Sequence, residues 1–276
     1  MKMNKFIGKV LGIFNRFIYW IFGIFKYNIL FNIKRWLRIH KVKGFYERYE
    51  GLLEYKNRHN GERCFIVATG PSLRISDLDM LKNEICFSVN TIFKAFEDTD
   101  WRPTYYTIQD HFVYNQHKDK IDKISDGVKQ KFFSDWLLEK CSVQGNIFFP
   151  TNVKDNYLLA YKKVPGFSDD CFDTVYASTT IVYSTMQLAV YMGFKEIYLL
   201  GCDCNFSGPQ KHFKTDINEE RDFVKSLNDV SKYYERTYNV AKQYTESHNI
   251  KIFNATRGGS LEVFERVNLD ELLENT

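Results

Sequence analysis

Residues 63–73 constrain the fold of this chain more than any other stretch of the sequence. They begin as a short apolar run, typical of a buried strand, and a helical pattern follows from Ile75. Between the two lie four small residues, Thr69, Gly70, Pro71 and Ser72. A strand that passes through such a turn into a helix presents backbone N–H groups to a phosphate, although Gly-Pro-Ser is also ordinary turn chemistry. The stretch predicts an α/β domain with a nucleotide or nucleotide-sugar site.

Apolar runs alternate with helical patterns from residue 61 onwards. The predicted strands cover 64–69, 85–89, 104–108, 147–149, 196–201 and 250–253. The predicted helices cover 75–82, 91–97, 128–140, 180–192, 219–247 and 268–274. This alternation is typical of a mostly parallel sheet with helices on both faces. We therefore expect a Rossmann-like, doubly wound α/β fold, in which ligands bind beyond the carboxyl ends of the strands.

Polar side chains follow several of these strands at the point where each one ends. Asn90 comes after the second strand, Asp110 after the third and Asp203 after the fifth. The predicted helix that begins near residue 180 opens with Ser178, Thr179 and Thr180. These three are good N-caps, and the same hydroxyls and free N–H groups favour a bound anion. The polar strand ends predict a ligand site at one edge of the sheet.

Residues 204–218 are predicted to form a loop between the fifth strand and a long helix. Loops at this edge often carry function and can close over a substrate. His212 lies in this loop, and a histidine titrates near neutral pH. It therefore suits a general base that removes a proton from an acceptor hydroxyl. The alternatives are that His212 is a solvated surface residue and that His111 is the base.

The positive charge of the chain is concentrated at its N-terminus. Residues 1–46 contain ten Lys or Arg and no acidic residue, whereas the rest of the chain carries a net charge of −6. Apolar residues recur at helical spacing over 6–31, but the longest apolar stretch, 17–25, is shorter than the roughly 20 residues of a membrane span. We expect residues 1–60 to form a basic amphipathic helical segment at a membrane interface and residues 61–276 to form the enzyme domain. Alternatively, the helix packs on the protein's own body or on a second subunit.

Neither the cysteines nor the acidic residues predict a metal site. The six cysteines show no CxxC spacing, which is typical of reduced thiols in a cytosolic protein. Asp77 and Asp79 have the Asp-X-Asp spacing of many glycosyltransferase metal sites. They fall inside a predicted helix, however, where a carboxylate in the first turn favours the helix dipole. We interpret them as part of that helix.

The motifs resemble those of a known superfamily. The residues that carry the resemblance are 68–73, Asn90, 178–180 and the run 192–203. They are similar to the bacterial sialyltransferases of glycosyltransferase family forty-two, and to a wider superfamily of flagellin-modifying motility-associated factors and archaeal 6-hydroxymethylpterin diphosphokinases. The resemblance covers roughly residues 61–255. It implies a CMP-activated nonulosonic acid donor and an inverting, metal-independent transfer, with His212 and Asp203 as catalytic residues and the Gly-Pro-Ser turn and Asn90 on the nucleotide.

These observations predict a glycosyltransferase that modifies a lipid-linked or cell-surface glycan with a sialic-acid-like sugar. Its partners are a nucleotide sugar and a membrane surface, with no nucleic acid, and a homo-oligomer is left open. No cofactor is expected besides the donor, and the enzyme is placed on the inner face of the cytoplasmic membrane. One alternative is a diphosphokinase that uses ATP and Mg²⁺, with Asp110 and Asp203 as metal ligands. The other is a non-catalytic nucleotide-binding scaffold in envelope assembly.

Overall fold

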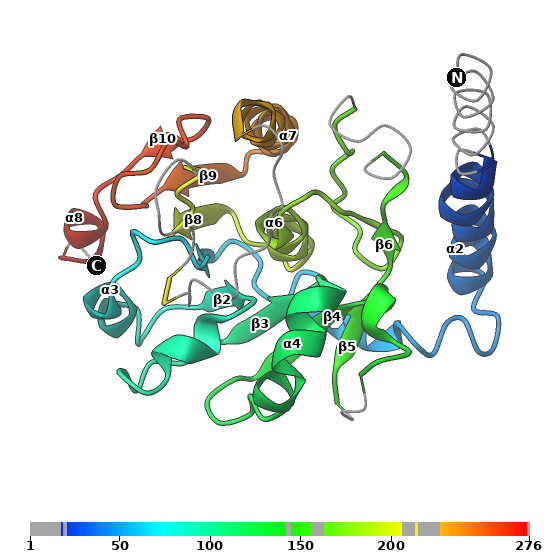
Figure 1. Cartoon of the computed structure of the whole chain (residues 1–276), viewed down its shortest axis with the longest axis horizontal. Coiled ribbons are helices and arrows are strands. Elements are labelled where there is room, and N and C mark those ends of the chain that lie inside the picture. The colour runs from blue at the N-terminus through cyan, green and yellow to red at the C-terminus, as the bar shows by residue number, and fades with distance from the viewer. Residues whose placement is uncertain are drawn as a thin grey trace, which may run out of the picture.

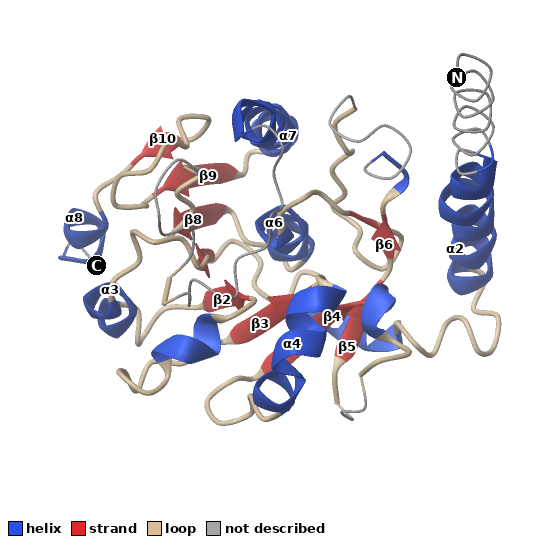
Figure 2. Cartoon of the chain, viewed as in Figure 1, coloured by secondary structure: helices blue, strands red, loops and turns tan. Residues whose placement is uncertain are grey.

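One large sheet forms the centre of the protein (Figures 1 and 2). The computed structural model describes residues 18, 21–141, 145–155, 163–205, 213–214 and 227–274. The eight strands of the sheet are all parallel and lie in the order β10-β9-β8-β1-β2-β3-β4-β5. Their bounds are β1 Arg63–Val67, β2 Cys86–Val89, β3 Tyr105–Ile108, β4 Gln130–Ser134, β5 Ile147–Phe149, β8 Glu196–Leu200, β9 Lys251–Asn254 and β10 Glu265–Arg266. A separate two-stranded sheet pairs β6 (Thr151–Asn152) with β7 (Val175–Tyr176).

Helices cover both faces of the large sheet, which confirms the predicted Rossmann-like α/β class. The α-helices are α2 Phe31–Ile39, α3 Ile75–Met80, α4 His111–Asp122, α6 Ile181–Tyr191, α7 Leu227–Ser247 and α8 Leu269–Glu274. The other helices are the π-helical turn η1 Phe25–Leu30 and the 3-10 helices η2 Glu50–Tyr55, η3 Ile92–Ala95 and η4 Asp135–Leu137. In β1, Cys64 and Ile66 join one core with α6 and α7, whereas Phe65 and Val67 join a second core with α3, α4 and α8. Both faces of β1 are therefore buried, which explains its uninterrupted apolar sequence.

The strand order places a topological switch point between β1 and β8. From β1 the sheet extends through β2, β3, β4 and β5 on one side, and the chain then returns to β8 on the other side. Val67 and Leu200 are paired at the carboxyl ends of these two neighbouring strands. The chain leaves them in opposite directions, so a crevice opens between the turns that follow, and ligands of doubly wound sheets bind there.

Two sequence predictions about elements are wrong. Residues 128–140, predicted as a helix, form β4 followed by the short helix η4. Phe132 and Phe133 are buried in the two different cores, on opposite faces of the sheet. The strand therefore lacks the alternation of polar and apolar residues by which a strand is recognised in a sequence. Helix α4 was not predicted, because Tyr114 and Ile121 are its only buried residues and its apolar periodicity is weak.

The N-terminal helix lies at one side of the body, in blue in Figure 1. It is helical from residue 21 to Ile39, with the π-helical turn η1 in its middle. This confirms the predicted helical extension in the described residues, and residues 1–17 lie outside them. In the described part of the chain, no helix is both long and apolar enough to cross a bilayer.

Candidate functional site

The switch point between β1 and β8 holds a small cleft. Five of the predicted site residues line it: Thr69, Gly70, Asn90, Thr180 and Asp203. The cavity has a volume of about 110 Å³, below the roughly 300–1,000 Å³ of most small-molecule pockets. It therefore accommodates one group of a ligand between the described residues. Residues 206–212, which follow the cleft residue Asn205 in the sequence, lie outside the residues that the structure describes.

The turns after β1 and β8 touch each other through Gly70. Its N–H donates to the carbonyl of Gly201 over 2.9 Å, and a Cβ atom at Gly70 would overlap both that carbonyl and the Oδ2 of Asp203. The Ser72 hydroxyl donates to the same Oδ2 over 2.9 Å, and the Ser72 N–H approaches it at 3.4 Å. Within the described residues, the Gly-Pro-Ser turn therefore binds and orients the Asp203 carboxylate. Pro71 and Ser72 themselves are not among the residues that line the cleft.

Asn90 has two features that are costly in a folded protein. Its backbone is in the left-handed region, with φ at 47°, which costs a non-glycine residue roughly 1–3 kcal/mol. Its side-chain Oδ1 is buried and has no hydrogen-bond partner among the described residues, at a cost of about 1–3 kcal/mol. The Tyr106 hydroxyl donates to the Asn90 carbonyl over 2.6 Å and holds the residue in place. An acceptor fixed in this way in a cleft is suited to a hydrogen bond from a ligand.

The N-terminus of α6 opens into the same cleft. Thr180 caps this helix, because its Oγ1 accepts from the N–H of Val182 over 3.2 Å, and Ile181 and Val182 also line the cavity. All residues of α6 are buried, so little solvent screens the positive end of its dipole. Ser178 is buried with its hydroxyl unpartnered among the described residues, while Thr179 is exposed. This end of α6 favours a negatively charged ligand group.

The acidic residue predicted after β3 has a different role. The Asp110 Oδ1 accepts from the N–H groups of Phe112 and Val113 over 2.7 and 3.4 Å, so it caps α4. Asp110 does not line the cleft beside Asp203. In the described part of the chain, no group of three His, Cys, Asp or Glu side chains could hold a metal ion. The magnesium ligands of the diphosphokinase alternative, Asp110 and Asp203, are therefore not both part of the cleft lining.

The predicted base, His212, lies outside the described residues, but the residue after it is anchored at the cleft. The N–H of Phe213 donates to the Thr69 carbonyl over 2.8 Å, and the Phe213 ring is buried. Lys214 then forms an ion pair with Asp98. The chain therefore reaches the rim of the cleft immediately after position 212. The competing residue, His111, lines a different cavity, between α4 and the N-terminal helix.

Four other residues that line the cleft were not predicted as site residues. Cys202, Cys204, Tyr234 and Tyr238 form part of its wall. Burial raises the pKa of the Cys204 thiol to about 12 and raises that of Cys202 as well, so both are neutral at physiological pH. The two tyrosines are four residues apart on α7, a spacing that is equally typical of a core-facing helix. These residues give the cleft an uncharged wall.

Comparison with known proteins identifies the family. Residues 27–209 match the model of the family described as "6-hydroxymethylpterin diphosphokinase MptE-like", and this is more than half of the chain. The protein belongs to this MptE-like family. The match confirms the predicted superfamily, although it begins within the N-terminal helix and ends at residue 209, whereas residues 61–255 were expected.

One solved structure is also similar. It is titled "Structure of MAf glycosyltransferase from Magnetospirillum magneticum AMB-1", with 15% sequence identity and a TM-score of 0.46. The similarity covers 79% of this chain and 37% of that one, so the protein spans little more than a third of the length of its neighbour. No curated protein matches the chain.

Proposed function

We propose that the protein is a glycosyltransferase that binds a nucleotide-activated sugar in the switch-point cleft. The unpaired Oδ1 of Asn90, in the same cleft as the N-terminus of α6, carries this proposal. The helix end suits a phosphate, and the amide oxygen suits a hydroxyl or amino group. A nucleotide offers both kinds of group in one molecule, whereas a simple anion would leave the buried oxygen unpaired.

The proposed donor is CMP-linked and sialic-acid-like. Phosphoryl transfer from ATP depends on metal ions that neutralise the charge of several phosphates. Here Asp203 is bound by Ser72, and Asp110 caps α4. A CMP leaving group carries a single phosphate, whose charge a helix N-terminus can stabilise by itself. This contrast favours a CMP sugar over the ATP-dependent alternative.

In the proposed reaction, a hydroxyl oxygen of the acceptor attacks the anomeric carbon of the sugar. The bond from that carbon to the phosphate oxygen breaks, and CMP leaves with the electron pair. The N-terminus of α6 stabilises the charge on the phosphate, and His212 accepts the proton of the attacking hydroxyl. Asp203 is held at the edge of the cleft by Ser72, where it orients the donor sugar or the base.

A thermal-shift panel of CMP, UDP, GDP and ATP, each with and without Mg²⁺, tests the proposal. We expect CMP to stabilise the protein without Mg²⁺, by about 2.7 kcal/mol at a hundred times its dissociation constant. Asn90→Ala should lose most of this shift, because the alanine has no side-chain acceptor. Asn249→Ala is the matched control, because Asn249 also has a left-handed backbone (φ 54°) but is exposed at the end of α7.

The other functions give different results in the same panel. Stabilisation by ATP only in the presence of Mg²⁺ would favour the diphosphokinase. Stabilisation by CMP without hydrolysis or transfer of a CMP sugar would favour a non-catalytic scaffold. Wild-type affinity for CMP in Asn90→Ala would move the nucleotide site away from this cleft.

A further inference from the structure

A second cavity lies between the N-terminal helix and the carboxyl ends of β3 and β4. Its volume is about 450 Å³, several times that of the cleft at the switch point. The cationic side chains that line it are Lys26, Lys34, Arg38, Arg48 and Lys140. We propose that this basic cavity binds the phosphate group of a lipid-anchored acceptor. The inference rests on the proposed function, because it names the class of acceptor for the same reaction.

Positive charge dominates the basic cavity. Lys34, Arg48 and Lys140 form no ion pair within the described part of the chain, and Lys26 lies over the rings of two neighbouring aromatic residues. Two acidic residues, Asp135 and Glu139, also line it.

The Asp135 carboxylate is bound by groups of the body. It already accepts from the Tyr49 hydroxyl over 3.0 Å and from the Thr151 N–H over 3.1 Å. Burial is the main effect on its pKa and raises it, which favours the neutral form. Even with both carboxylates charged, the five cationic side chains of the lining outnumber them, so the cavity attracts an anionic group.

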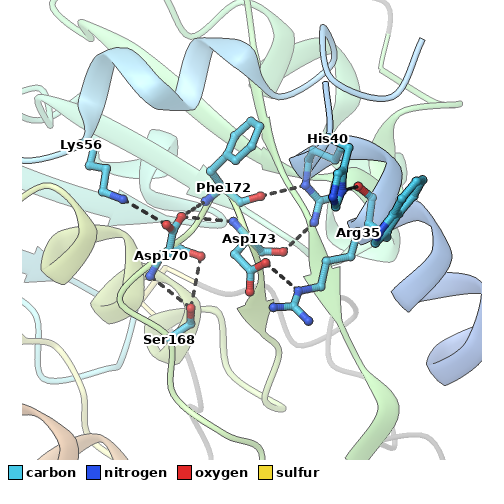
Figure 3. Close-up of polar contacts among 9 residues, drawn as sticks. Arg35, His40, Lys56, Ser168, Asp170, Phe172 and Asp173 are labelled. Atoms are coloured by element: carbon cyan, nitrogen blue, oxygen red, sulfur yellow. Dashed lines mark hydrogen bonds and ion pairs between the residues drawn. The ribbon is translucent and has the colours of Figure 1, made fainter. Parts of the chain in front are cut away.

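The helix that forms one wall of the basic cavity is fixed to the body by two arginines. Arg35 Nε lies 2.6 Å from the Asp173 Oδ1, as Figure 3 shows. Arg38, which is 2% exposed, donates to the carbonyls of Phe172 and Asp173 over 2.7 and 2.5 Å. Its guanidinium also lies 4.7 Å from the centre of the Tyr49 ring. These contacts orient the helix and hold its basic side towards the body.

The opposite side of the helix is apolar and uncovered. Six large side chains form this apolar stripe: Ile21, Phe22, Phe25, Ile29, Ile33 and Trp36. They recur every three or four residues and are 47–56% exposed. An apolar face of this size is typical of an interaction surface.

The charge of the segment identifies an anionic membrane as the occupant of the apolar stripe. Residues 1–46 contain no acidic residue, so a second copy of the helix would bring like charges together. An anionic bilayer instead offers an apolar phase for the stripe and negative headgroups for the lysines. The helix would then lie in the interface with the basic cavity beside it.

The position of the basic cavity suits an acceptor site. His111 follows β3 and Asp135 follows β4, and both line the cavity. These strands are parallel to β1, so the cavity and the switch-point cleft are at the same edge of the sheet. A lipid-borne glycan with its phosphate in the basic cavity would extend along the edge that holds the proposed donor.

Vesicle co-sedimentation tests this inference on the full chain. The vesicles are phosphatidylcholine alone or phosphatidylcholine with phosphatidic acid. We expect binding only with phosphatidic acid, and a loss of about 30-fold in Lys34→Glu/Arg48→Glu, in which two attractive charges are reversed. Phe25→Ser/Ile29→Ser should also lose binding, because it replaces two apolar side chains of the apolar stripe by polar ones. The control Lys232→Glu/Lys251→Glu reverses two exposed lysines elsewhere and should bind as the wild type does.

Three outcomes would overturn the inference. One is equal binding of wild type and cavity variant to the acidic vesicles. Another is stabilisation by soluble glycerol phosphate without vesicle binding, which would identify a free phosphate ligand. The third is a dimer in sedimentation velocity that Phe25→Ser/Ile29→Ser abolishes, which would identify a second copy. The thermal shift that CMP induces is measured in each variant as well. Because the basic cavity lies outside the nucleotide cleft, its variants should keep this shift even where the inference fails. A missing CMP shift in the wild type would instead contradict the proposed function.

Discussion

At the scale of single residues, the cleft depends on close contact between two turns. The sequence predicted that Thr69, Gly70, Asn90, Thr180 and Asp203 would share one site, because each follows a strand or opens a helix. It could not predict the hydrogen bond between the side chains of Ser72 and Asp203, which are separated by 131 positions in the sequence. It also could not predict that the Asn90 oxygen is unpaired, because this depends on the packing around it.

Gly70→Ala should destabilise the protein by about 1–3 kcal/mol, as overpacking usually does, and weaken CMP binding. The added methyl group would overlap the Gly201 carbonyl and the Asp203 carboxylate, which forces the turns apart. Gly51→Ala is the control, since its methyl group would meet only the Ile147 side chain, at 3.2 Å, and no backbone atom. Urea unfolding and calorimetry measure the two effects. An unchanged CMP affinity in Gly70→Ala would show that the contact between the turns does not shape the site.

His212→Ala should lower turnover about 10²–10⁴-fold, the usual contribution of a general base, with little change in donor affinity. Phe213, the next residue in the sequence, is anchored at the cleft, because its N–H donates to the Thr69 carbonyl. His111→Ala is the comparison, since His111 lines the basic cavity and should affect the acceptor KM more than kcat. If the kcat loss occurs in His111→Ala and not in His212→Ala, the base is His111.

At the scale of elements, strands of three or more residues were predicted better than two-residue strands, with β4 as the exception. Strand β5 has its predicted bounds, and β1, β2, β3, β8 and β9 lie within two residues of theirs. The short strands β6, β7 and β10 were missed, because two residues carry no periodicity. Contacts between distant elements were also unpredictable. Arg257, for example, joins α3 to α8 by binding Asp77 Oδ1 over 2.7 Å and both Asp270 oxygens.

Arg257→Ala should destabilise the protein by about 3 kcal/mol, because it leaves the fully buried Asp77 without its cation. Lys82→Ala, which removes the exposed partner of Asp79, should cost less than about 1 kcal/mol. Urea unfolding measures both. Similar losses in the two variants would show that the buried pair contributes no more than a surface pair.

The cost of Arg257→Ala should also depend on pH. Arg257 lowers the pKa of Asp270 in the folded state. This contribution to stability is present above the unfolded pKa of about 3.9 and is lost as the pH falls through the lower folded value. The difference between wild type and Arg257→Ala should therefore shrink in acid. A difference that grows below pH 4 would contradict this account.

At the scale of the whole molecule, the N-terminal helix binds the body on one side and exposes the apolar stripe on the other. Charge and periodicity predicted its amphipathic character, but not that Arg38 is buried against Phe172. The segment was expected at a membrane interface, with packing on the body as the alternative, and Arg35 and Arg38 bind the body. Removing residues 1–40 would therefore open a buried contact as well as delete the apolar stripe, so point variants test the membrane role more cleanly.

Arg38→Ala should detach the helix from the body. It leaves the carbonyls of Phe172 and Asp173 without a charged donor, and a hydrogen bond to a charged group contributes about 1.5–3 kcal/mol. We expect a loss of stability of that size and faster proteolytic cleavage between the helix and η2, because cleavage of a locally opened segment follows its opening equilibrium. Lys43→Ala, in the exposed connection after the helix, is the control. If Arg38→Ala resists cleavage as the wild type does, other contacts hold the helix, and the wall of the basic cavity does not depend on this arginine.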